Sequence, residues 1–176
     1  MFKIIIKKGI KFIGTHIISL AVTVFLVMIL SWLIEKWGFF AFSVVTSVIY
    51  FALFYSDGWN WGRLEGRPYN EIKESPLRAL KASLIPSIIP LIFTILSATN
   101  ISNPITTVII KLWYFPFIGF YNSQENISLK EILLSGAVLP VITTIGYFIG
   151  TKNFSLLEKI SFRKRKSKQN SKPSNS

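Results

Sequence analysis

The stretch YSDGWNWGRLEGRPYNEIKESPLRALK, residues 55–81, is the only long polar segment in the middle of a very apolar chain. Apolar runs flank it on both sides. They are long enough to cross a membrane, because about 20 helical residues at a rise of 1.5 Å span a hydrocarbon core of roughly 30 Å. The segment therefore divides the chain into two membrane-embedded halves and is the first candidate for a functional region.

The composition agrees with this division. Hydrophobic residues make up 51% of the 176 residues and charged residues only 16%, whereas a soluble domain carries about 25% charged residues. We predict an all-α integral membrane protein with a helical membrane domain, residues 1–152, and a basic cytoplasmic tail, residues 153–176, which is partly disordered. The net charge of +12 lies beside apolar runs, which favours anionic lipids of the inner leaflet, and not nucleic acid, as the partner.

Four transmembrane helices in two antiparallel hairpins follow from the apolar runs. The predicted helices are residues 12–34, 39–55, 76–98 and 129–150, with a cytoplasmic loop at 56–75. Gly38 makes the turn of the first hairpin. Ser75 and Pro76 suit the N-cap and first position of the third helix. Ser128 and Glu131 form a capping box at the start of the fourth.

Residues 103–127 are predicted to be an outer interfacial segment and not a fifth crossing. Lys111 lies near the middle of the apolar part and Pro116 interrupts it. A lysine at a helix centre costs about 2.5–3.5 kcal/mol on insertion scales. The aromatic residues of this segment suit the membrane interface better than the bilayer centre.

The distribution of positive charge supports four crossings. Basic segments remain in the cytoplasm, and three segments are rich in lysine and arginine: the N-terminus, the central stretch and residues 152–172. All three lie on one side only if the chain crosses the membrane an even number of times between Lys81 and Lys152. We therefore predict a plasma-membrane protein with both termini in the cytoplasm.

The central stretch contains a regular glycine pattern. Gly58, Gly62 and Gly66 are spaced by four residues, so they form a smooth stripe if the second helix continues past residue 55. Glycine is a poor helix former, so a loop is the alternative. Gly146 and Gly150 form a similar small-residue pair in the fourth helix.

Two groups of residues are candidate contact sites. The candidate interaction loop comprises Asp57, Trp59, Trp61, Arg63 and Glu65. The candidate contacts to anionic lipid are Arg163, Lys164, Arg165, Lys166 and Lys168.

Catalytic and cofactor-binding patterns are not found in the sequence. The chain has no cysteine and one histidine, His16, which we interpret as a packed or interfacial side chain without an acidic partner in the predicted helices. The glycine pattern lacks the Lys-Ser/Thr that follows the glycines of a phosphate-binding loop. We predict no cofactor and no metal, and an enzyme is the least favoured class.

The segments YSDGWNWG, residues 55–62, and LRALKASLIP, residues 77–86, resemble a group of small, uncharacterised multi-pass membrane proteins of low-GC Gram-positive bacteria. The resemblance implies a bacterial plasma membrane and a similar number of helices. It implies no activity, since none is known for that group.

Two hypotheses for the function follow. The first is an accessory or assembly subunit that acts by contact, with a protein partner or a second copy of the chain. The second is a small permease or channel component, because Pro86 and Pro90 interrupt the third helix and small polar residues form stripes such as Ser43 and Ser47. Close helix packing is the alternative explanation of those stripes.

Overall fold

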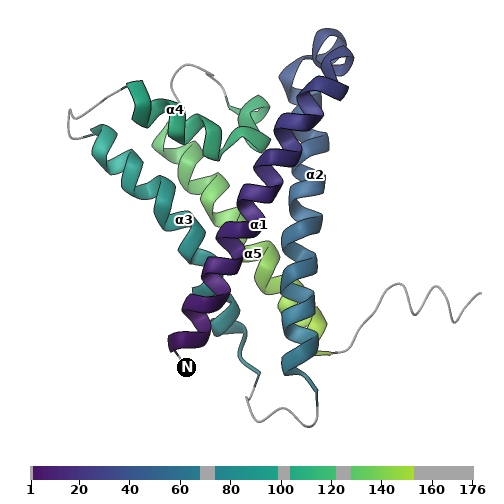
Figure 1. Ribbon diagram of the computed structural model, residues 1–176, viewed down its shortest axis with the longest axis vertical. Helices are drawn as coiled ribbons and strands as arrows, with labels where there is room; N and C mark the ends of the chain where they lie inside the picture. The colour runs from purple at the N-terminus through teal and green to yellow at the C-terminus, as the bar shows by residue number, and fades with distance from the viewer. Residues whose placement is uncertain (1, 68–73, 99–103, 122–127, 153–176) are drawn as a thin grey trace, which may run out of the picture.

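The computed structural model describes residues 2–67, 74–98, 104–121 and 128–152, and all regular structure in these ranges is helical (Figure 1). The elements are α1 (Phe2–Ile29), α2 (Ser31–Glu65), α3 (Pro76–Ala98), α4 (Pro104–Trp113), the 3₁₀ helix η1 (Phe115–Phe120) and α5 (Leu129–Thr151). Among the described residues, four helices are long and apolar enough to cross a membrane, namely α1, α2, α3 and α5. For the described residues, the predicted all-helical fold with four candidate spans is therefore confirmed.

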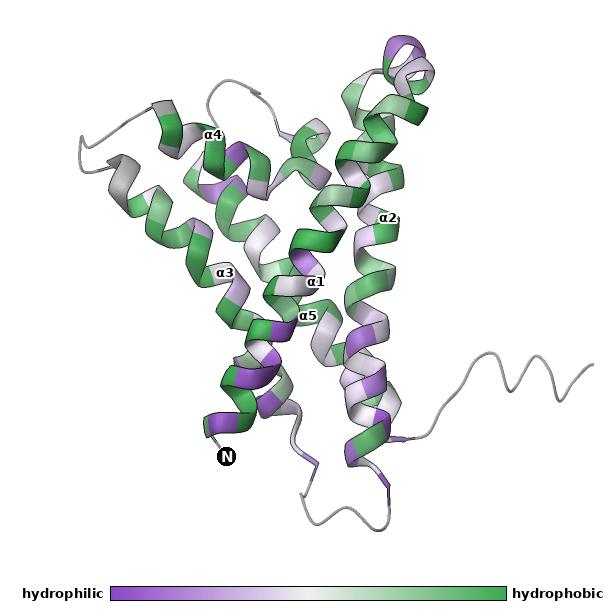
Figure 2. Ribbon diagram, viewed as in Figure 1, coloured by the Kyte–Doolittle hydropathy of each residue, from purple (hydrophilic) through white to green (hydrophobic). Residues whose placement is uncertain are grey.

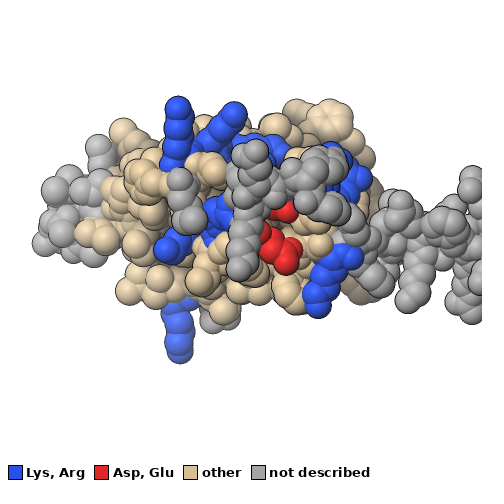
Figure 3. Space-filling view, turned by 90° about the horizontal axis from the view of Figure 1, so that it is seen from below, with Lys and Arg blue, Asp and Glu red and all other residues tan. Residues whose placement is uncertain are grey.

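The two ends of the bundle differ in chemistry. The start of α1, the end of α2, the start of α3 and the end of α5 lie at the lower end, whereas α4 and η1 lie near the upper end (Figure 1). Hydrophobic residues predominate between the ends (Figure 2). We call the lower end the basic end. Its described cationic residues are Lys3, Lys7, Lys8, Lys11, Arg63, Arg67, Arg78, Lys81 and Lys152. Figure 3 shows this end with basic side chains around a few acidic ones.

The first helix differs from the predicted range of residues 12–34. Helix α1 already begins at Phe2 and ends at Ile29. Lysine is a good helix former, so the basic N-terminal residues do not prevent the helix from starting early. A short helical piece follows the break at Leu30, and Gly38 then adopts a positive φ of 71°. Glycine tolerates this conformation without a Cβ clash, and the predicted turn at Gly38 is confirmed.

The second helix does not end at residue 55. Helix α2 continues to Glu65, so the first half of the predicted loop at 56–75 is helical. Of the two alternatives for the glycine stripe, a helix and a loop, the helix is therefore confirmed. A Cβ atom added at Gly58 would lie 2.3 Å from the Thr143 carbonyl oxygen of α5. Close backbone contact with α5 offsets the low helix propensity of glycine.

The long helices do not pack mainly in chain order. Helix α2 makes its largest contact with α5, and α1 makes its largest contact with α3. The contact between α1 and α2, the partners of the first predicted hairpin, is smaller than either. Helix α3, at Pro76–Ala98, has the predicted range, and α5, at Leu129–Thr151, begins at the predicted residue with the predicted capping box.

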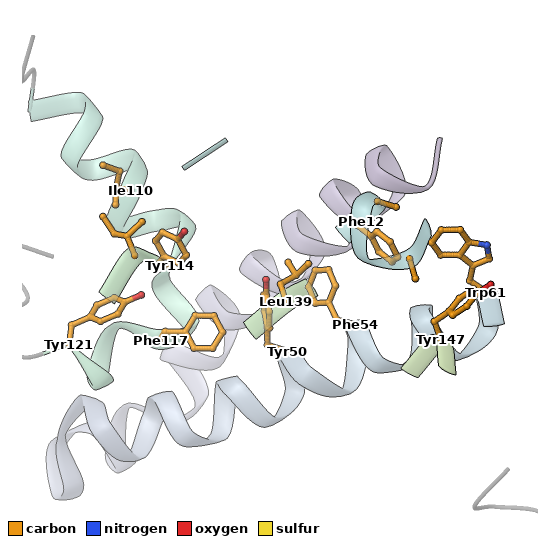
Figure 4. Packing of buried hydrophobic residues seen from close by; sticks show 13 residues of the cluster. Phe12, Tyr50, Phe54, Trp61, Ile110, Tyr114, Phe117, Tyr121, Leu139 and Tyr147 are labelled. Atoms are coloured by element: carbon orange, nitrogen blue, oxygen red, sulfur yellow. The ribbon is translucent and has the colours of Figure 1, made fainter. Parts of the chain in front are cut away.

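The described part of the aromatic segment at 103–127 packs against the long helices. Its described part forms α4 and η1, and Tyr114, Phe117 and Tyr121 belong to the buried core (Figure 4). Thr46 of α2 donates a hydrogen bond to the Pro116 carbonyl oxygen at 2.9 Å, and Ser43 accepts one from the Gly119 N–H at 2.7 Å. Non-helical backbone is tolerated at membrane depth when protein groups satisfy it in this way. The described part of the segment therefore packs as part of the bundle, and its location at the membrane interface stays a prediction.

Candidate functional site

A buried polar network lies at the basic end and is centred on Glu65. One carboxylate oxygen accepts hydrogen bonds from Trp61 Nε1 at 2.7 Å and from the Arg78 guanidinium at 3.3 Å. The other accepts from the Tyr147 hydroxyl. The Tyr147 hydroxyl in turn accepts from the Ser75 backbone N–H at 2.9 Å. The network therefore joins α2, α3 and α5 at one point.

The network is almost completely shielded from solvent. The side chains of Arg78 and Glu65 are 3% and 6% exposed. An ion pair of this kind is costly to break, because removal of one partner leaves the other charge buried. The Trp61 ring packs edge-on against Tyr147, with ring centroids 5.3 Å apart, and Lys8 of α1 lies 5.2 Å from the Trp61 ring centroid. The first helix thus also contacts the network.

A second ion pair joins α1 to α2. Asp57 of α2 binds the Lys11 ammonium group, and its other carboxylate oxygen accepts a hydrogen bond from Thr15. The Lys11 side chain is 53% exposed, so solvent screens this pair and it contributes less than the buried pair.

The five predicted interaction residues fall into two groups. Trp61 and Glu65 are buried, and Asp57 is bound to α1. Arg63 is exposed, with its guanidinium 4.8 Å from the ring centroid of the partly exposed Trp59. The structure therefore brings the residues together on one helical segment but leaves Trp59 and Arg63 on the outer surface. The predicted lipid contacts Arg163, Lys164, Arg165, Lys166 and Lys168 lie outside the described residues.

The partners of these residues were not identified from the sequence. Arg78, Tyr147 and Lys11 are far from Glu65 and Asp57 along the chain, so helical periodicity cannot pair them. The available signals were indirect: Arg78 lies in the first turn of α3, and Tyr147 lies between Gly146 and Gly150. Tyr147 meets the glycine stripe of α2 only once α5 packs on α2.

A second polar group is located inside the bundle. His16 lies near the middle of α1 and is 1% exposed. Its Nδ1 lies 2.9 Å from the Tyr50 hydroxyl, and its ring stacks on Trp113 of α4 at a centroid distance of 4.1 Å. His16 is therefore packed inside the bundle, which was one of the two predicted locations, and the residues that it contacts are aromatic.

Two tyrosines of the aromatic segment have raised pKa values. Burial raises the pKa of Tyr114 and raises the pKa of Tyr121 to about 12. The Tyr121 hydroxyl forms a hydrogen bond with Ser135 at 2.9 Å.

Among the described residues, no three histidine or acidic side chains gather as a metal site would need.

The comparisons with known proteins return no relative: no family model matches the chain, and no curated protein or solved structure is significantly similar to it.

Proposed function

We propose that this chain is a multi-pass plasma-membrane protein with both termini in the cytoplasm, which acts by contact as an accessory or assembly subunit. The observation that carries the proposal is that acidic side chains at the basic end bind basic side chains of other helices in the same bundle. Glu65 and Asp57 bind within the bundle, and this fixes the end of α2 as a rigid helix. A rigid, preformed surface suits a contact function, because less order has to be imposed on binding.

The positions of the helix ends support the proposed orientation. The two most basic described regions, namely the start of α1 and residues 63–67 with 74–81, lie at the same end of the bundle as the end of α5. Under the positive-inside rule this end faces the cytoplasm. Its lysines and arginines then lie at the inner leaflet, where anionic headgroups attract them.

The surface offered to a protein partner is the exposed side of the last turns of α2. Arg63 and Trp59 form a cation–aromatic pair there, and Leu64 beside them is 47% exposed. Arginine and tryptophan are the residue types most enriched at the energetic centres of interfaces. A partner protein or a second copy of the chain would contact this surface.

The polar stripe of α2 does not favour the permease hypothesis. The hydroxyl groups of Ser43 and Ser47 would have to line a polar path, but Ser43 accepts a hydrogen bond from the Gly119 N–H and Ser47 donates one to the Pro116 carbonyl oxygen. Hydroxyls that satisfy irregular backbone are part of the packing of the bundle.

Site-specific photo-crosslinking in native membranes tests the proposal. A photoreactive amino acid at Arg63 is expected to give a defined protein adduct. The same amino acid at Phe25, which is 62% exposed on α1 and distant from the basic end, serves as the lipid-facing control. Recovery of only the uncrosslinked chain at Arg63, Trp59 and Leu64 would contradict a contact function.

A further inference from the structure

A groove opens between α3 and α5 on the outer side of the bundle, where several of its lining side chains are exposed. Its volume is about 390 Å³, within the size range of small-ligand sites. Leu84, Ile88, Leu91 and Leu133 line it and are each between 36% and 53% exposed. Ala137 lies on the α5 side of the groove. The walls are therefore aliphatic and suit a hydrocarbon chain.

The groove adjoins a small polar cavity. The cavity has a volume of about 10 Å³ and shares the lining residues Ser87, Tyr114 and Gly136 with the groove. This volume is close to the lower limit for one water molecule, so one hydroxyl group fits. The Tyr114 hydroxyl lies at the junction, 3.3 Å from a Cβ atom built at Gly136.

An unsatisfied hydrogen-bonding atom lies at the cavity. His16 lines it, and within the described part of the chain no group forms a hydrogen bond with the buried Nε2 atom of His16. The Trp113 carbonyl lies near the ring but does not complete a hydrogen bond to Nε2. A buried polar atom without a partner costs free energy, so a ligand group that pairs with it gains that free energy on binding.

From this geometry we propose that the groove and cavity together bind a long-chain primary alcohol from the bilayer. The chain lies between α3 and α5, and the terminal hydroxyl reaches His16 Nε2. A hydroxyl donates and accepts, so it matches either tautomer of the histidine. Among the described residues that line the groove and the cavity there is no lysine, arginine, aspartate or glutamate. A charged headgroup would therefore be buried there without a partner, which is unfavourable.

The test uses purified protein in nanodiscs and a saturated long-chain primary alcohol with a diazirine in its chain. Illumination is expected to label the peptides of α3 and α5 that line the groove. Unlabelled alcohol should compete about five- to tenfold better than its methyl ether or the alkane of equal length, which corresponds to about one hydrogen bond. His16→Phe should remove that preference.

A pair of variants keeps the test independent of the folding of the His16 variant. Ala137→Trp fills the groove and should abolish the labelling. Leu134→Trp is the matched control, because Leu134 is on the same helix, is 71% exposed and does not line the groove. Equal competition by alcohol, ether and alkane would show an ordinary lipid contact and overturn the proposal. Undiminished labelling in Ala137→Trp would overturn it as well.

Discussion

Gly62 of α2 and Tyr147 of α5 lie in backbone contact: a Cβ atom added at Gly62 would lie 2.0 Å from the Tyr147 carbonyl oxygen. The contact is reciprocal along the interface, because a Cβ atom at Gly150 would lie 2.2 Å from the Trp59 carbonyl oxygen. The same approach brings the Tyr147 hydroxyl to Glu65. Close packing of α2 on α5 is thus the condition for the buried polar network at the basic end.

Gly62→Ala is expected to destabilise the protein by about 1–3 kcal/mol, because the added methyl group meets backbone that cannot rotate away. Equilibrium unfolding in detergent micelles measures the change. Gly14→Ala is the matched control, since nothing lies within 4 Å of a Cβ atom built at Gly14. There the alanine should stabilise the helix by up to about 1 kcal/mol. Equal effects at both positions would contradict the close contact.

The buried ion pair predicts a non-additive response to mutation. Arg78→Met should cost roughly 3–5 kcal/mol, because it leaves the Glu65 carboxylate buried without its cation. The double variant with Glu65→Gln should recover part of that loss. Lys11→Met is the exposed counterpart and should cost about 0–1 kcal/mol. A double-mutant cycle from unfolding curves gives the coupling energy, and additive losses at Glu65 and Arg78 would argue against the pair.

The attachment of η1 to α2 can be tested by a nearly isosteric change. Thr46→Val removes the hydroxyl that donates to the Pro116 carbonyl oxygen at 2.9 Å and should cost about 0.5–1.5 kcal/mol. Amide hydrogen exchange at Gly119 should become faster. In the control Thr23→Val, the lost hydroxyl donates to the Ser19 carbonyl of its own helix, so exchange at Gly119 should not change. Unchanged exchange in Thr46→Val would mean that η1 is held by other contacts.

Local sequence signals predicted the ends of the described helices best where a residue affects the backbone next to it in the chain. The Ser128–Glu131 capping box marks the start of α5, and Pro76 marks the start of α3. The turn at Gly38 was predicted because a change of direction needs a residue that tolerates positive φ. The glycine stripes of α2 and α5 were both recognised, although their mutual contact follows only from the fold.

Long-range pairings could not be predicted in the same way. From hydropathy alone, Glu65 and Arg78 are expected to be solvated charges. In the structure both side chains are buried, and the Arg78 guanidinium binds the Glu65 carboxylate. The aromatic residues around Pro116 were predicted to lie at the interface, since their composition fits an amphipathic surface. Tyr114, Phe117 and Tyr121 are also buried against the bundle, and Ser43 and Thr46 supply hydrogen bonds for the irregular backbone of this segment. No local pattern shows which polar stripe will satisfy which segment.

The predicted topology is tested by two glutamate-to-cysteine variants in a chain that lacks cysteine. Glu35 and Glu74 are both exposed and lie at opposite ends of the bundle. If the basic end faces the cytoplasm, Glu35→Cys should react with an impermeant thiol reagent in intact cells, whereas Glu74→Cys should react only after the membrane is permeabilised. Neither change alters the lysines and arginines that set orientation under the positive-inside rule. Labelling at Glu74→Cys with protection at Glu35→Cys would invert the topology and move the proposed contact surface to the outside of the cell.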